Sequence, residues 1–247
     1  MPAGFGDDAP TDFRWGDDPV DALYFGDDLI WQAYSPPVVM ARSGGTDGSS
    51  TTSHTITLPA SPVAGELLLV VIGGGANVTY STSSSGWTVR GQAAFNTGSY
   101  ASIAVLAGIA GTAGALTVTT SGSARCLHTS FRIGSWSGDL ADVKLATATG
   151  SASSAANPPS LTPGYEGASP EALWIVGANI AEFAGSQPIT AAPAGYSNLA
   201  LQHVAYNSAL GTAELVAAGA TQDPAVFTNA TGSSRNWATT TISVLGG

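Results

Sequence analysis

Residues 66–71 read Glu-Leu-Leu-Leu-Val-Val, and residues 171–176, which begin 105 positions later (66 to 171), read Glu-Ala-Leu-Trp-Ile-Val. Apolar runs of this length are typical of strands that are covered on both faces. The turn at 84–87, Ser-Ser-Gly-Trp, likewise reappears at 193–196 as Pro-Ala-Gly-Tyr. Such self-similarity predicts two copies of one strand pattern, over residues 53–136 and 157–245.

The first copy contains six apolar segments that are rich in β-branched and aromatic residues and bounded by Gly, Pro, Ser or Asn. We predict that these segments are strands: His54–Leu58, Glu66–Gly74, Trp87–Phe95, Tyr100–Ile109, Leu116–Ser121 and Cys126–Trp136. Two such halves predict roughly twelve strands in an all-β, antiparallel, jelly-roll-like β-sandwich. Either the two copies share one sandwich, or they form two small sandwiches side by side. Residues 141–154 are predicted to be a loop or an edge strand.

The last of these segments alternates along its length. Leu127, Thr129, Phe131 and Ile133 alternate with Cys126, His128, Ser130 and Arg132. This period of two predicts a strand with one buried face.

Residues 1–34 form a distinct, acidic region with a ten-residue rhythm. The pattern aromatic-Gly-Asp-Asp begins at Phe5, Trp15 and Phe25. Gly-Asp is turn chemistry, so we expect two or three short β-hairpins, which are too small to bury their aromatic side chains alone. This region is therefore interpreted as an arm that packs on another chain or on the main body. Residues 35–52 contain Pro36-Pro37 and a run of Gly, Ser and Thr, and are predicted to be a linker.

Charge excludes some classes of partner. The net charge is −10, and eight of the seventeen acidic residues lie in the first 28 positions. The seven Lys and Arg residues are scattered, whereas nucleic-acid binding requires clustered cations. The acidic arm suits a basic partner surface. No apolar run approaches the ~18 residues of a membrane span, so we expect no membrane insertion. An acidic start also predicts no signal peptide.

Residue types that carry chemistry are few. Cys126 is the single cysteine and is expected to be inert and half-buried. His54, His128 and His203 have no metal-ligand spacing. A Ser–His–Asp triad remains an open alternative, because its members need not be adjacent in sequence. The paired Asp residues of the arm are interpreted as solvated turns or docking groups, with a bound cation as the alternative. We therefore assign no catalytic, metal or cofactor-binding residue and expect a protein that is not an enzyme.

The segments 65–71, 86–88, 102–106, 117–119 and 125–133 together resemble a β-sandwich module of bacteriophage tail and fibre proteins. The arm segment Val20–Trp31 is similar to a short V-x-A-x-Y-x-G-x-x-x-(V/I)-W element that accompanies modules attached to a virion. This resemblance implies a structural component of a phage or phage-like particle: a tail fibre, spike or decoration protein that is present in the virion and assembled in the bacterial cytoplasm.

The resemblance and the arm lead to specific expectations about partners. The arm is expected to bind other virion proteins in a homo-oligomeric assembly through Phe5, Trp15, Asp17, Asp18, Tyr24, Phe25, Asp27, Asp28 and Trp31. The alternative is an adhesin that binds a host-surface glycan, with Tyr165 and Tyr206 as candidate stacking residues near loops. A β-sandwich glycan hydrolase is a third reading. Trp87 and Tyr196 would become receptor candidates only if both pointed to solvent.

Overall fold

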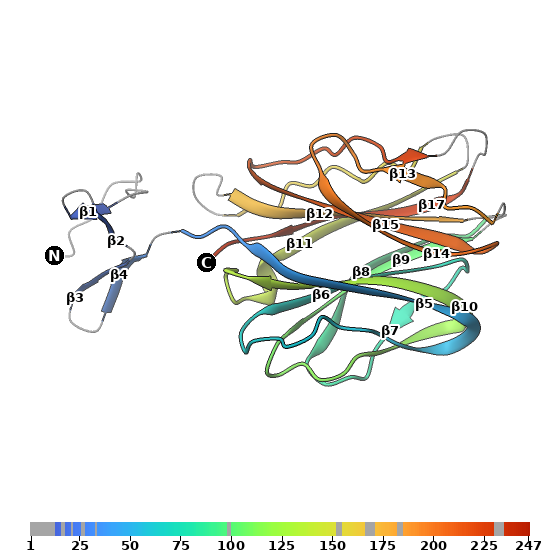
Figure 1. The fold of residues 1–247 in the computed structure, drawn as a ribbon, viewed down its shortest axis with the longest axis horizontal. Coiled ribbons are helices and arrows are strands. Elements are labelled where there is room, and N and C mark those ends of the chain that lie inside the picture. The colour runs from blue at the N-terminus through green and yellow to red at the C-terminus, as the bar shows by residue number, and fades with distance from the viewer. Residues whose placement is uncertain are drawn as a thin grey trace.

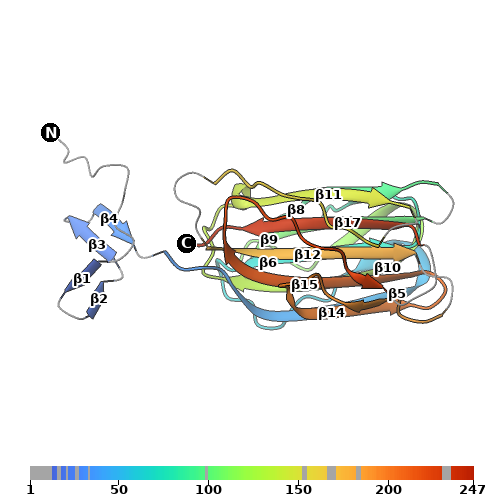
Figure 2. The ribbon, with the colours of Figure 1, turned by 90° about the horizontal axis from the view of Figure 1, so that it is seen from above.

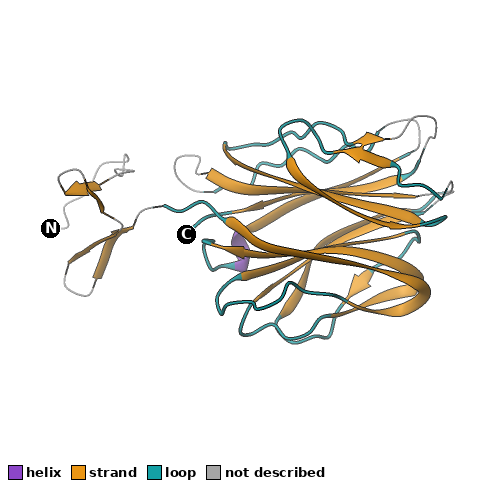
Figure 3. Cartoon of the chain, viewed as in Figure 1, coloured by secondary structure: helices purple, strands orange, loops and turns teal. Residues whose placement is uncertain are grey.

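The fold was analysed in a computed structural model of the chain, drawn in Figure 1. It describes residues 34–97, 100–151, 155–165, 171–181, 185–229 and 235–247, together with the backbone of four short strands before residue 34. Strands dominate these residues, and one 3-10 turn, Leu140–Asp142, is the exception (Figure 3). The protein is an all-β, antiparallel β-sandwich.

The first half of the body forms one sheet. Its strands are β5 (Val38–Thr55), β6 (Leu67–Gly74), β7 (Tyr80–Ser81), β8 (Trp87–Phe95), β9 (Ala101–Ile109) and β10 (Thr117–Gly134). The spatial order is β5-β10-β6-β9-β8, and the short β7 pairs with β10 beside this path. All of these pairings are antiparallel.

The second half forms the other sheet. Its strands are β11 (Val143–Gly150), β12 (Glu171–Ala181), β13 (Ile189–Ala191), β14 (Ser197–Val204), β15 (Ser208–Ala218), β16 (Thr228–Asn229) and β17 (Trp237–Val244). The spatial order is β11-β17-β12-β15-β14, and β13 pairs separately with β16. In both halves the first strand lies at an edge and pairs with the last. The two halves therefore have the same topology.

The register of the sheets fixes which residues correspond. Leu67 of β6 lies opposite Ile133 of β10, and Leu173 of β12 lies opposite Val244 of β17. The register therefore matches Leu67 with Leu173. The sequence alignment, which pairs Glu66 with Glu171, matches Leu67 with Ala172, one position earlier. Because a slip of one residue exchanges the two faces of a strand, only this register places equivalent side chains on equivalent faces.

The two sheets pack face to face, as Figures 1 and 2 show. Across the interface β8 lies against β11, and β14 lies against β5, so equivalent strands make equivalent contacts. Leu67, Leu69, Leu173 and Ile175 belong to one hydrophobic core shared by both sheets. The body is therefore a single sandwich with an internal pseudo-two-fold axis, like a symmetric dimer joined into one chain. Each half supplies one sheet, whereas the sheets of a jelly roll mix strands from both halves.

Each sheet also buries its outer face, under its own loops. In the first half Leu68, Val70 and Trp87 belong to a second core, and in the second half Trp174 and Val176 belong to two smaller ones. This explains why residues 67–72 are apolar without interruption: the expectation that this strand is covered on both faces is confirmed.

The predicted linker is largely a strand. Residues 38–55 form β5, which pairs with β10 along most of its length, so the prediction of a linker over 35–52 is wrong for this part. Its glycines serve close packing. A Cβ on Gly44 would lie 2.4 Å from the Gln202 side chain, and one on Gly45 would lie 2.8 Å from the His128 ring. Composition alone does not distinguish such glycines from flexible ones.

Other predicted boundaries also change. The segments Leu116–Ser121 and Cys126–Trp136 are parts of one continuous strand, β10. Both of its faces are buried over residues 126–131, where one buried face was predicted. The second face is covered because the segment after β5 is hydrogen-bonded to it: Ser130 donates to the carbonyl of Thr57 at 2.6 Å. Residues 143–150 form the edge strand β11, which was one of the two predicted alternatives.

The N-terminal region contains two hairpins, β1 (Phe13–Trp15) with β2 (Asp18–Val20) and β3 (Ala22–Phe25) with β4 (Asp28–Gln32). This agrees with the expectation of two or three hairpins. Figures 1 and 2 draw them to one side of the sandwich. The chain then joins the body at Tyr34, whose hydroxyl donates to the carbonyl of Glu171, and Ser35, whose N–H donates to the carbonyl of Gly247 at 2.8 Å.

Candidate functional site

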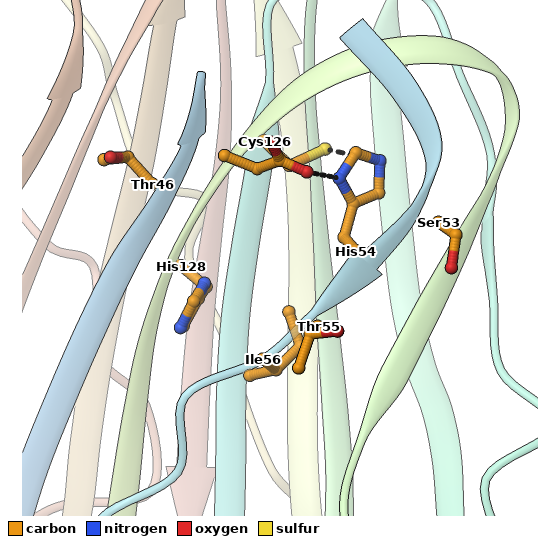
Figure 4. A pocket seen from close by; sticks show the side chains of 8 residues that line it. Thr46, Ser53, His54, Thr55, Ile56, Cys126 and His128 are labelled. Carbon is orange, nitrogen blue, oxygen red and sulfur yellow. Dashed lines mark hydrogen bonds and ion pairs between the residues drawn. The ribbon is translucent and has the colours of Figure 1, made fainter. Parts of the chain in front are cut away.

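Among the residues that the structure describes, a group of reactive side chains lies where β5 bends over β10. Asp47 pairs with Cys126 of β10, and His54 pairs with Val118 further back on the same strand. The register shifts twice between these two pairs. Irregularities of this kind bend a strand, and here they bring Asp47 and His54 onto one site beside Cys126. Figure 4 shows this pocket.

His54 occupies the centre of the group. Its Nδ1 lies 3.0 Å from Oδ2 of Asp47, while its Nε2 lies 3.5 Å from Sγ of Cys126 and 3.2 Å from Oγ1 of Thr120. A carboxylate only accepts hydrogen bonds, so Asp47 holds the imidazole proton on Nδ1. With the proton on Nδ1, Nε2 is an acceptor, and it faces both the thiol of Cys126 and the hydroxyl of Thr120.

The thiol is neutral in this environment. Cys126 is 2% exposed and His54 is 1% exposed. Burial, together with the negative charge of Asp47, raises the pKa of the Cys126 thiol to about 12. Cys126 is fully buried where half burial was expected, and the expectation of an inert thiol stays a prediction.

A second imidazole lines the same pocket. The Nε2 atom of His128 accepts a hydrogen bond from the backbone N–H of Thr57 at 3.0 Å. Burial lowers the pKa of His128 to about 4, although the bond from Thr57 acts in the opposite direction. His128 is therefore neutral at pH 7. Because its Nε2 is an acceptor, its proton lies on Nδ1.

The pocket has a volume of about 270 Å³. Eight residues line it, and most of them are polar: Thr46, Asp47, Ser53, His54, Thr55, Ile56, Cys126 and His128. A thiol, a base and a carboxylate in this order are the components of a nucleophilic triad. Among the residues that the structure describes, no three His, Cys, Asp or Glu side chains are grouped to hold a metal ion.

The sequence offered only a weak signal for this site. A single Cys together with His and Asp elsewhere in the chain is the general pattern of a thiol nucleophile. Asp47, however, lay in the supposed linker, and His54 and Cys126 are 72 residues apart. The open alternative named Ser as the nucleophile, whereas the structure places Cys126 beside the imidazole.

The predicted arm residues divide into two groups. Phe5, Asp17 and Asp27 lie outside the described residues. The other six lie on the hairpin strands and are described by their backbone alone: Trp15, Asp18, Tyr24, Phe25, Asp28 and Trp31. The role of the arm in binding stays a prediction.

The two candidate glycan-stacking residues differ. The Tyr165 ring is half-buried, and its hydroxyl bonds to the carbonyl of Asp142 at 2.9 Å and to Oγ of Ser243 at 3.0 Å. Burial raises the pKa of Tyr165. Tyr206 is 70% exposed and has a φ of 58° in the turn between β14 and β15. Of the two, Tyr206 has the exposure that ring stacking requires.

Trp87 and Tyr196 occupy equivalent positions in the two halves. Each follows a glycine with positive φ, and each N–H donates back across the turn, to Ser84 at 3.4 Å and to Pro193 at 3.0 Å. Trp87 is part of the outer core of its half, and Tyr196 packs against the outer cores of the other. These aromatic residues therefore belong to the core and are removed from the receptor candidates.

No family model, curated protein or solved structure matches this chain. Within the described part of the chain, no helix has the length and apolar character needed to cross a membrane.

Proposed function

We propose that the protein is a structural component of a phage-like virion, such as a tail fibre, spike or decoration protein, anchored to neighbouring subunits by its N-terminal arm. The observation that supports this most is the division of the chain. Two small hairpins precede a sandwich that buries its own apolar residues between its sheets and beneath its loops. Hairpins of this size do not form a core of their own, so the proposal assigns their aromatic residues to a partner surface.

The difference between the two ends of the body supports the same proposal. The arm joins at the end of the sandwich where β12 begins and β10 and β17 end, because Tyr34 contacts Glu171 and Gly246 there. The turns β8–β9 and β14–β15 lie at the opposite end. An arm fixed in a particle would therefore project these turns outward, in several copies if the subunits form a ring.

The test is removal of residues 1–33, which retains Tyr34 and its contacts with the body. When particles assemble in the presence of the truncated chain, they should not contain that chain, whereas the intact chain should co-purify with the particles. A second variant replaces Asp17, Asp18, Asp27 and Asp28 by Asn, which removes charge and keeps the length, and it should be incorporated less than the intact chain if the arm docks on a basic surface. Normal incorporation of the truncated chain would refute the anchor.

Exposure of Tyr206 favours a second candidate function, an adhesin that binds a host-surface glycan. Tyr206 lies in the turn at the end opposite the arm, and Tyr100, next to the equivalent β8–β9 turn, is also exposed. Glycan-array binding that Tyr206→Ala abolishes and Tyr165→Phe preserves would support it. An array without hits for the intact protein would remove it.

A further inference from the structure

We propose that Cys126, His54, Asp47 and His128 form an acyl-transfer site that hydrolyses short-chain carboxylic esters. This inference goes beyond the structural role proposed above and does not depend on it. It would add an enzymatic activity to a chain whose sequence predicts none.

The first element is the contact between nucleophile and base. Sγ of Cys126 lies 3.5 Å from Nε2 of His54, which is hydrogen-bonding distance for sulfur. Because the buried thiol is neutral, it must lose its proton as it attacks, and Nε2 is placed to accept that proton. The pair would then work as serine and histidine do in hydrolases, without a preformed thiolate.

The second element orients the base. Oδ2 of Asp47 lies 3.0 Å from Nδ1 of His54, on the side of the ring away from Cys126. This contact fixes the tautomer whose Nε2 lone pair faces Sγ of Cys126, and it stabilises the imidazolium that forms during attack. Asp47 is therefore a positioning residue, because it acts through His54.

The third element is a donor for developing negative charge. His128 is two residues from Cys126 on β10 and lines the same pocket. Its Nε2 is engaged by Thr57, so its Nδ1 carries the proton. A neutral imidazole that donates from a pocket wall can polarise a carbonyl oxygen without itself changing charge.

The pocket sets the class of substrate. Its volume of about 270 Å³ suits a short acyl group. Its lining supplies hydroxyls from Thr46, Ser53 and Thr55 and only one aliphatic side chain, Ile56. A short ester with a polar surround, such as an acetyl ester, fits this lining better than a long aliphatic chain.

Hydrolysis of the ester at this site needs no reactant besides the ester and water. Sγ attacks the ester carbonyl and its proton passes to Nε2 of His54; the C–O bond breaks, and the alcohol leaves with that proton. Water then attacks the thioester, again giving a proton to His54. The C–S bond breaks, the carboxylic acid is released, and the thiol is restored.

The experiment uses the full-length chain with p-nitrophenyl acetate. We expect hydrolysis above the buffer rate and an acetyl group on the Cys126 peptide in mass spectra of rapidly quenched samples. Cys126→Ala and His54→Gln should each reduce the rate roughly a hundredfold or more. His128→Gln should reduce kcat. His203→Gln, a histidine of β14 outside this pocket, is the matched control and should leave the rate unchanged.

Asp47 requires a readout that separates positioning from structure. Asp47→Asn should lower kcat with little change in KM, and Asp47→Glu should restore part of it, with thermal melts showing that both variants are folded. The proposal is overturned if the wild-type protein does not exceed the buffer rate. It is equally overturned if no acetyl group is found on Cys126, and this measurement on the unmodified chain does not depend on any variant folding.

Discussion

Gly73 and Asn179 occupy equivalent positions in the two halves and lie against each other across the shared core. A Cβ on Gly73 would lie 2.6 Å from Cγ of Asn179. The amide of Asn179 donates to the carbonyls of Gly74 at 2.9 Å and Ser102 at 3.0 Å. The pseudo-two-fold symmetry is therefore not exact at this contact. One half contributes a polar side chain, and the other contributes the space for it.

This contact leads to a coupled pair of variants. Gly73→Ala should destabilise the protein by about 1–3 kcal/mol, because the new methyl group overlaps the Asn179 side chain. Asn179→Gly should also destabilise it, because two buried hydrogen bonds are lost. The double variant should be more stable than the sum of the two effects predicts, as measured by urea denaturation. Additive effects would show that the two residues are not in contact.

The glycines of β5 provide a second test. Gly45→Ala should destabilise the sandwich by about 1–3 kcal/mol, because its Cβ would meet the His128 ring. Gly48 lies on the same strand and has open space around its Cβ position, so Gly48→Ala is the matched control. Its free energy of unfolding should stay equal or rise by about 0.5 kcal/mol. Equal effects of both variants would mean that residues 43–50 behave as a linker after all.

Burial of neutral His128 predicts a pH dependence of stability. Its pKa of about 4 in the folded state lies below the ordinary value of 6.5, so the unfolded chain binds the proton more tightly. The contribution of His128 to the free energy of unfolding is therefore complete above about pH 6.5 and is lost as the pH falls towards about 4. Urea midpoints at pH 7 and pH 5 should differ less in His128→Gln than in the wild type. His203→Gln should keep the wild-type difference; a wild-type difference retained in His128→Gln would contradict this assignment.

The body should fold without the arm. Its cores contain residues from position 56 onward, with Val39 packed against the shared core. Deletion of residues 1–33 should therefore shift the melting temperature by only a few degrees, as measured by calorimetry. Loss of cooperative unfolding in the truncated chain would show that the hairpins are part of the folding unit.

Much of the fold could be predicted because its signals are local. The apolar run 67–72 indicates a strand covered on both faces, and the repeated turns at Gly86 and Gly195 indicate duplication. The alignment of the halves was nevertheless one residue short at Leu67, because two continuous apolar runs match almost as well in either register. Only the pairing of neighbouring strands distinguishes the two faces.

The candidate site was the least predictable part. Asp47 lies in a stretch whose Gly and Ser content indicates flexibility, whereas His54 begins a predicted strand, and no spacing rule links either residue to Cys126. Their proximity results from a bend in β5 against β10, and bends of this kind depend on the partner strand as much as on the bent strand.

The sequence by itself determined the all-β class and the two-fold repetition of a strand pattern, because alternation, apolar runs and turn residues act over a few neighbouring positions. The tertiary structure alone decided that each copy forms one sheet, that the sheets share a core, and that Asp47, His54 and Cys126 meet. These features depend on contacts between segments far apart in the chain, where packing and hydrogen bonding across strands outweigh local preference.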